Sequence, residues 1–407
     1  MAPPLPPRQL RLQAQARSPP PALMDELIGE ILLRLPLCEP ASLARAALVC
    51  KAWRRTVSDG RFLRRYRDFH GAPPLLGYIR NTYDRPRLVP TSTAHLPFSM
   101  PRHASSSSTR MHIKRRPRWW ALDCRHGRLL ICHLIGGLSV RFIVWDPITG
   151  ASKHLKAPPA HIFSYYAAAV VDAVDSCDHL PYAAAVLCAV DGCDHLCCHG
   201  GPFQVVLVGT HIVDQKHVAC WATAYSSEAQ EWGAASPSIV LNCPKFMVWT
   251  PSILIGDVLY FTLRVPWGAT IILKYDLLGS HGLSMVDTLA LARSAVLVEA
   301  DDGGLGFVSV RGNCIYIMAQ QTAGVDGATE WVQRRAIDIS TTLIPKYPYR
   351  VIGYVEGTDT VFVSTAAGVF TLDLKSRRAT KVSGETRTPW DILPYTTFYL
   401  HSRYIGR

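Results

Sequence analysis

Apolar residues recur at helical spacing in the first part of the chain, between residues 22 and 70. The first segment has Asp25 placed as an N-cap and Pro36 as a stop, and its apolar positions are Leu27, Ile28, Ile31, Leu32 and Leu35. A second segment follows Pro40 and ends near Trp53, and a third runs from Phe62 to Phe69. We therefore predict a small all-α domain of three helices. So short a domain buries little surface, and we expect an apolar face of it to meet a partner.

From about residue 119 the pattern changes to short alternating strands separated by turns rich in Gly, Asp and Pro, which is typical of an all-β domain. Five units of two β-runs can be recognised: 127–132 with 141–150, 204–209 with 217–225, 255–263 with 270–276, 310–318 with 335–338, and 359–364 with 368–374. Repeated strand pairs that bury their faces only against neighbours indicate a propeller. At about 45 residues per blade, residues 119–407 allow roughly six blades.

Two further segments have no periodic pattern. Residues 1–21 are rich in Pro and Arg without the apolar run of a signal peptide, so we predict disorder there. Residues 71–118 are rich in Pro, Ser and Arg, and we predict a linker between the helical domain (22–70) and the propeller (119–407). No uninterrupted apolar stretch is long enough to span a membrane, so we expect no membrane partner.

The net charge of +12 is unevenly distributed. Residues 1–118 hold 21 Lys and Arg against 7 Asp and Glu, which leaves 22 against 24 for the rest. A basic N-terminal part suits an acidic partner surface or non-specific contact with nucleic acid. The second alternative would use the run Lys114, Arg115, Arg116 and Arg118. Because no aromatic side chain is interleaved in that run for base stacking, we expect a solvated surface and no nucleic-acid partner.

Cysteine and histidine residues are dense between positions 177 and 199. They are Cys177, His179, Cys188, Cys193, His195, Cys197, Cys198 and His199. Soft ligands at this density could hold zinc. However, the segment lacks paired Cys-x-x-Cys knuckles, and residues 175–180 resemble residues 191–196, so a local duplication explains the density. We therefore predict a loop between blades, reduced thiols and no metal.

We find no motif for catalysis. Gly-x-Ser-x-Gly, a Walker-type loop and His-Glu-x-x-His are all absent from the sequence. Asp301 and Asp302 lie in a Gly-rich turn, which favours an exposed loop over a cation site. We assign no catalytic residue and no cofactor. The alternative is a propeller enzyme that holds a cation or small molecule at its axis, which would require converging carboxylates or histidines.

The helical segment resembles an F-box in residues 30–36, Leu43, 49–54 and 62–63. The resemblance implies docking on a Skp-type adaptor, and through it on a cullin-based ubiquitin ligase. Met24 and Gly60 stand where the family commonly has Pro, and both loosen the local backbone without removing an apolar anchor. The adaptor contacts that the motif implies, some of which will instead be internal core, are Leu27, Ile31, Leu32, Leu35, Pro36, Leu43, Val49 and Trp53.

The β-rich part resembles the propeller-like associated domain of plant F-box proteins, especially those of grasses, in residues 144–150, 193–203 and 394–399. The two resemblances together imply a non-catalytic substrate-recognition subunit that presents the propeller to an unknown target protein. They also imply a location in the cytoplasm or nucleus, where the adaptor is found. An F-box protein that acts as a scaffold outside a ligase is the remaining alternative.

Overall fold

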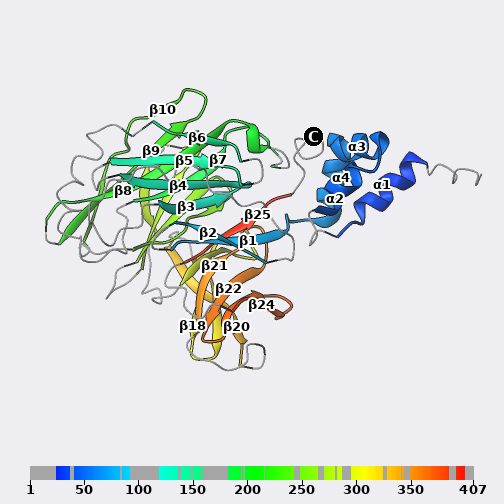
Figure 1. The fold of residues 1–407 in the computed structure, drawn as a ribbon. Coiled ribbons are helices and arrows are strands. Elements are labelled where there is room, and N and C mark those ends of the chain that lie inside the picture. Colours follow the sequence, from blue (N-terminus) through cyan, green and yellow to red (C-terminus); the bar gives the residue numbers. More distant parts are fainter. Residues whose placement is uncertain are drawn as a thin grey trace, which may run out of the picture.

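The computed structural model contains four α-helices and six β-sheets in the part of the chain that it describes (Figure 1). The described residues are 24–36, 41–82, 85–91, 119–135, 139–147, 150–156, 158, 182–193, 195, 198–214, 216–242, 248–264, 270–279, 282–286, 295–323, 328–340, 342, 349–384 and 391–398. None of the helices within these ranges has the length and apolarity needed to cross a membrane. The predicted disordered segment 1–21 lies outside them.

The helices are α1 (Asp25–Leu33), α2 (Ala41–Ala47), α3 (Lys51–Ser58) and α4 (Gly60–His70). The predicted count of three was wrong because the second segment divides in two. Cys50 has an extended backbone there, and its Sγ accepts the backbone N–H of Trp53 at 3.5 Å, which caps a new helix. Asp59 caps α4 in the same way through Arg61. Asp25 is the first residue of α1, and Met24 occupies the N-cap position instead.

The helices share one apolar core, built from the inward positions of all four. Its buried members are Ile28, Leu32, Leu33, Leu43, Ala46, Ala47, Val57, Phe62, Leu63, Tyr66 and Phe398. Phe398 comes from the far end of the described chain, and its ring packs edge-on against Tyr66 at a centroid distance of 6.5 Å. The helical domain is therefore completed by a residue that follows the last strand.

Each β-sheet is one blade of a six-bladed propeller, and the strands within every blade are antiparallel. Blade 2 consists of β3 (Trp119–Arg125), β4 (Arg128–Ile135), β5 (Ser139–Trp145) and β6 (Ser152–His154). Blade 3 consists of β7 (Tyr182–Cys188), β8 (Phe203–Ile212), β9 (His217–Ser226), β10 (Glu231–Trp232) and β11 (Ile239–Asn242).

Blades 4 to 6 follow in chain order. Blade 4 consists of β12 (Val248–Trp249), β13 (Ile253–Ile255), β14 (Val258–Arg264), β15 (Thr270–Asp276) and β16 (Leu283–Val286). Blade 5 consists of β17 (Val296–Glu299), β18 (Leu305–Arg311), β19 (Cys314–Ala323) and β20 (Ala328–Asp338). Blade 6 consists of β21 (Arg350–Tyr354), β22 (Thr360–Thr365), β23 (Gly368–Asp373) and β24 (Ala379–Ser383). All five hairpins expected from the sequence occur, as β4–β5, β8–β9, β14–β15, β19–β20 and β22–β23.

Blade 1 is built from both ends of the β-rich region. It consists of β1 (Leu75–Arg80), β2 (Arg87–Pro90) and β25 (Leu393–Thr396), in the order β2-β1-β25. β25 in turn contacts β3 on one side and β21 on the other, so the ring of blades closes here. This corrects the predicted linker, because residues 75–80 and 87–90 are strands of the propeller. Residues 83, 84 and 92–118 of that segment lie outside the described residues.

Apolar side chains fill the space between each blade and the next. Separate buried clusters lie between blades 1 and 2, 2 and 3, 3 and 4, 4 and 5, 5 and 6, and 6 and 1. The last of these, which seals the ring, packs Tyr78 of β1 against Phe362 of β22 with 5.4 Å between ring centroids. Each blade thus buries both faces only when its two neighbours are present.

The closing blade provides a test of this architecture. Leu76 is 1% exposed and lies in a cluster with Tyr395 of β25 and, from blade 2, Cys124. We expect Leu76→Ala to lower the free energy of unfolding by about 2–5 kcal/mol, because a cavity opens where the first and last strands of the propeller meet. Denaturant titration followed by tryptophan fluorescence measures this change. The control is Leu278→Ala at a residue that is 79% exposed, where we expect a change within about 0.5 kcal/mol. Equal small changes in both variants would contradict the packing of this blade.

Candidate functional site

One face of α1 carries an exposed apolar stripe. Met24, Leu27 and Ile31 are spaced by three and four residues, which puts them on one side of a helix, and they are 65%, 46% and 48% exposed. A second exposed apolar pair, Leu48 and Val49, lies at the junction of α2 and α3. Large apolar side chains left open to water in this way are typical of a surface that meets another protein.

The residues expected to contact an adaptor fall into three groups. Leu27, Ile31, Pro36 and Val49 are exposed. Leu35 and Trp53 are partly buried against the helical core. Leu32 and Leu43 are buried in that core, at 1% and 5% exposure, so here they support the helices and offer no surface to a partner. The sequence motif identifies all eight without separating these roles.

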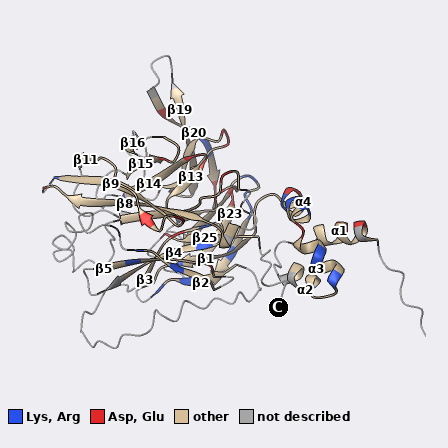
Figure 2. Ribbon diagram, turned by 90° about the horizontal axis from the view of Figure 1, so that it is seen from above, with Lys and Arg blue, Asp and Glu red and all other residues tan. Residues whose placement is uncertain are grey.

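The two helices in contact with α1, which are α3 and α4, carry basic residues (Figure 2). Lys51, Arg54 and Arg55 of α3 are exposed. On the other side, Glu30 of α1 forms ion pairs with Arg34 at 2.7 Å and with Arg65 of α4 at 2.5 Å. The hydrogen bond from Arg34, followed by that from Arg65, lowers the pKa of Glu30. The pair with Arg65 joins α1 to α4, and neither pair involves the α3 cations, which are available to an acidic surface.

A buried charge network joins the blades at the propeller axis. Arg125 of β3 is 5% exposed, and its guanidinium donates to Asp123 at 2.5 Å and to Glu356 in the β21–β22 turn at 2.6 and 3.0 Å. It also donates to the hydroxyl and the carbonyl of Ser252, which precedes β13. Asp123 accepts the backbone N–H of Val186 in β7 at 2.7 Å. One arginine therefore connects blades 2, 3, 4 and 6.

A second buried carboxylate joins the remaining blades. Asp391, which precedes β25, accepts hydrogen bonds from Arg264 of blade 4 at 2.7 Å and from Arg350 of blade 6 at 2.5 Å. Arg264 also donates to the carbonyl of Ala295, which precedes blade 5. Together with the Arg125 network, this arrangement reaches all six blades.

A cavity of about 340 Å³ lies beside both networks. Its lining includes Arg125, His126, His195, Glu356 and Asp391 from the propeller. Arg67 and Gly71, at the end of α4, and Phe398 complete it. The cavity therefore lies on the side of the propeller that faces α4. The sequence analysis did not identify this site.

The carboxylates of the cavity are already engaged by guanidinium groups. Asp123, Glu356 and Asp391 each accept a hydrogen bond from Arg125, Arg264 or Arg350. Burial raises the pKa of Asp123 to about 6, although the positive charge of Arg125 opposes the shift. A carboxylate with this pKa would suit general acid–base chemistry. However, Asp123 accepts hydrogen bonds from Arg125 and from the backbone N–H of Val186, so it links blades 2 and 3. We assign it no catalytic role.

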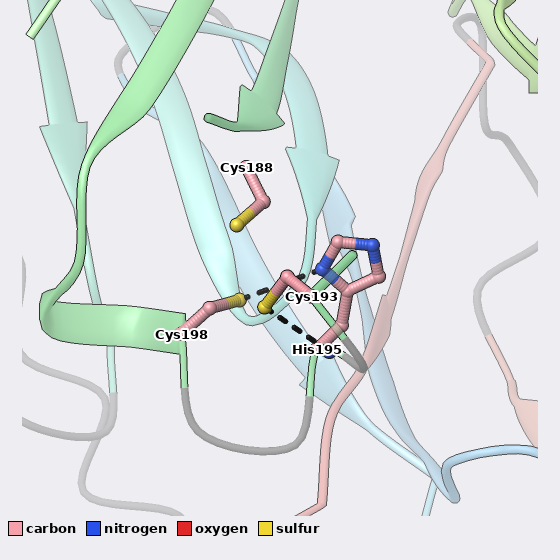
Figure 3. Close-up of side chains that lie close together, drawn as sticks. All are labelled: Cys188, Cys193, His195 and Cys198. Carbon is pink, nitrogen blue, oxygen red and sulfur yellow. Dashed lines mark hydrogen bonds between the residues drawn. The ribbon is translucent and has the colours of Figure 1, made fainter. Parts of the chain in front are cut away.

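The cysteine-rich region forms a compact cluster on the loop between β7 and β8. The Sγ atoms of Cys188, Cys193 and Cys198 and a ring nitrogen of His195 lie within 4.8 Å of one another (Figure 3). Burial raises the pKa of Cys198, and the neighbouring Cys188 adds to the shift. The other candidates from the sequence, Cys177, His179 and Cys197 and the side chain of His199, lie outside the described residues.

The basic run considered for nucleic-acid contact, residues 114–118, also lies outside the described residues.

The pair of aspartates in the Gly-rich turn lies on the surface. Asp302, expected in an exposed loop, is exposed and forms a surface ion pair with Arg334 at 3.2 Å. Asp301, beside it, lies 3.8 Å from Arg335.

The F-box domain family model matches residues 23–65, which agrees with the resemblance found over 22–70. No match was found among curated protein sequences. Among solved structures, a puromycin hydrolase is similar at a TM-score of 0.36 and 12% identity, over 66% of this chain and 39% of that one. TolB from Acinetobacter baumannii is similar at 0.32 and 12%, over 77% and 65%. The SapL1 lectin in complex with alpha methyl fucoside is similar at 0.32 and 11%, over 66% and 77%. At these TM-scores the similarities carry no argument about function.

The Arg125 network predicts a large stability difference between buried and surface arginines. Replacing Arg125 by Met leaves Asp123 buried without its cation, and we expect a loss of about 3–5 kcal/mol in the free energy of unfolding. The matched change Arg334→Met removes only a surface ion pair and should cost less than about 1 kcal/mol. Thermal and denaturant unfolding of the two variants measure the difference. Similar values for both would show that the axial network does not hold the blades together.

Proposed function

We propose that this chain is the substrate-recognition subunit of an SCF-type (Skp-cullin-F-box) ubiquitin ligase. The observation that carries the proposal is the F-box match over residues 23–65, together with the exposed apolar stripe on α1. In this proposal the helices bind a Skp-type adaptor, the adaptor binds a cullin, and the propeller binds a target protein. The chain itself performs no chemistry, and other subunits transfer ubiquitin.

The contact surface of the proposed adaptor consists of the exposed members of the predicted set. Four of them present apolar side chains to solvent: Leu27, Ile31, Pro36 and Val49. Leu32 and Leu43 are buried in the helical core and support the helices that carry these residues. A few apolar anchors of this kind usually supply most of the binding energy of a helical interface. Lys51, Arg54 and Arg55 next to them favour an adaptor surface that is acidic.

The propeller suits target recognition because its rigid blades carry many connecting loops. On the side of the propeller that faces α4, the cavity offers guanidinium groups and two histidines to a bound target. The likeness of the propeller motifs to those of grass F-box proteins supports a plant source as part of the proposal. A cytoplasmic or nuclear location follows from the proposed adaptor.

The experiment is a binding titration of the full chain with a purified Skp-type adaptor. The double change Leu27→Asp with Ile31→Asp places two charges in the proposed contact while leaving the helical core intact. If each anchor supplies more than about 1 kcal/mol, the dissociation constant rises by at least about 30-fold. Isothermal calorimetry measures the change.

The matched control is Leu278→Asp with Met285→Asp, two exposed apolar residues of blade 4, which should leave the affinity unchanged. Circular dichroism confirms that both variants fold. A well-folded wild-type chain that fails to bind the adaptor contradicts the proposal. Equal affinity of the Leu27 and Ile31 variant and the wild type contradicts the assigned surface.

A further inference from the structure

We propose that Cys188, Cys193, His195 and Cys198 bind one Zn²⁺ ion. This reverses the expectation from the sequence, which was based on irregular spacing. The structure shows that spacing along the chain is the wrong criterion here, because the loop folds back and gathers the four side chains at one point (Figure 3). The proposal concerns the propeller alone and does not depend on adaptor binding.

The distances fit a tetrahedral ion after a small contraction. Zinc bonds of about 2.3 Å to sulfur and about 2.0–2.1 Å to nitrogen place neighbouring ligand atoms about 3.6–3.8 Å apart. The four ligand atoms lie within 4.8 Å of one another, and Cys198 Sγ is 3.8 Å from His195 Nδ1. A movement of about 1 Å or less by each ligand atom, through side-chain rotation, would complete the tetrahedral geometry.

The donor set selects the metal by its chemistry. Three thiolates and one imidazole form a soft, closed set of four, which is the ligand pattern of structural zinc sites and disfavours Mg²⁺ or Ca²⁺. Binding releases the three thiol protons to solvent and transfers no electron. Because all four positions are filled by protein, the site leaves none open for a reacting water, and its role is structural.

The backbone of the loop is shaped for this convergence. Cys188 ends β7, where it pairs in register with Phe203 of β8, so the two strands fix the base of the loop. Gly192 and His195 have positive φ values of 62° and 57°, which turn the chain sharply on either side of Cys193. The backbone N–H of His195 points at Cys193 Sγ at 3.4 Å, a contact that stabilises a thiolate.

Side chains of blade 2 hold the loop from outside. Arg128 of β4 is buried, and its guanidinium donates to the carbonyls of Cys198 and Gly201. This places a positive charge beside a zinc site that carries one net negative charge with three thiolates. The ring of His126 stacks on the ring of His195 with 3.8 Å between centroids. Such outer contacts orient metal ligands and fix their rotamers.

The position of the site links the metal to the axial cavity. His195 and His126 both line that cavity, and His126 immediately follows Arg125 of the buried network. A zinc ion would therefore fix one rim of the cavity by fixing His195. The occupied site would give this rim of the cavity a defined shape.

The experiment measures metal content and thiol protection in the full chain. We expect about one zinc per chain by elemental analysis after purification, and Co²⁺ substitution should give the intense sulfur-to-cobalt charge-transfer bands of a thiolate site. Mass spectrometry after alkylation should show Cys188, Cys193 and Cys198 protected, and their labelling should rise at least tenfold once a strong chelator removes the metal. One equivalent of added Zn²⁺ should restore the protection.

Two variants separate the site from the rest of the chain. By elemental analysis, Cys193→Ser and His195→Gln should each hold well below one zinc per chain, because each keeps only three of the four ligands. Cys314→Ser, at a partly buried thiol in blade 5, should keep one zinc. Chelation of the wild-type chain makes the test independent of whether a variant folds. Absence of bound metal in a folded wild-type chain, unprotected thiols, or a disulfide between any two of the three cysteines overturns the proposal.

Discussion

The arrangement of four of the six blades depends on the burial of one guanidinium at the propeller axis. Arg125 is removed from water, and its charge is tolerated there because acceptors from blades 2, 4 and 6 surround the guanidinium. Blade 3 takes part through Val186, whose backbone N–H donates to Asp123. A buried charge of this kind contributes little net stability compared with an apolar core, but it requires its partners to lie in fixed positions. The inner strands of blades 2, 3, 4 and 6 must therefore be in register for the network to form. This constraint defines both the axis and the cavity beside it.

Much of the fold follows from local sequence pattern, and the parts that do not are non-local. Alternating runs predicted all five hairpins because partners such as β14 and β15 are close in the chain. Blade 1 was not predicted, since β1 pairs with β25 across nearly the whole chain and lies in a Pro-rich segment without alternation over more than a few residues. The split between α2 and α3 depends on a cysteine cap, which has no strong sequence signature.

The candidate sites show the same division. Helical periodicity identified the apolar positions of α1, but exposed Ile31 and buried Leu32 are neighbours. Only packing against the other helices decides which one faces solvent. The Arg125 network did have a signal: Asp123 and Arg125 alternate with half-buried residues on the inward face of β3, where charges are rare. The cysteine cluster was noticed from its density, whereas its geometry depends on loop turns at Gly192 and His195 that spacing rules do not capture.

The packing of Phe398 in the helical core has a consequence for the order in which the protein is made. The helices leave the ribosome first, but their core lacks this ring until the chain beyond β25 has been synthesised. Only Thr397 lies between β25, which closes the circle of blades, and Phe398, whose side chain completes the helical core. A nascent or prematurely terminated chain would therefore lack both, so that a finished propeller and a finished helical surface arise together.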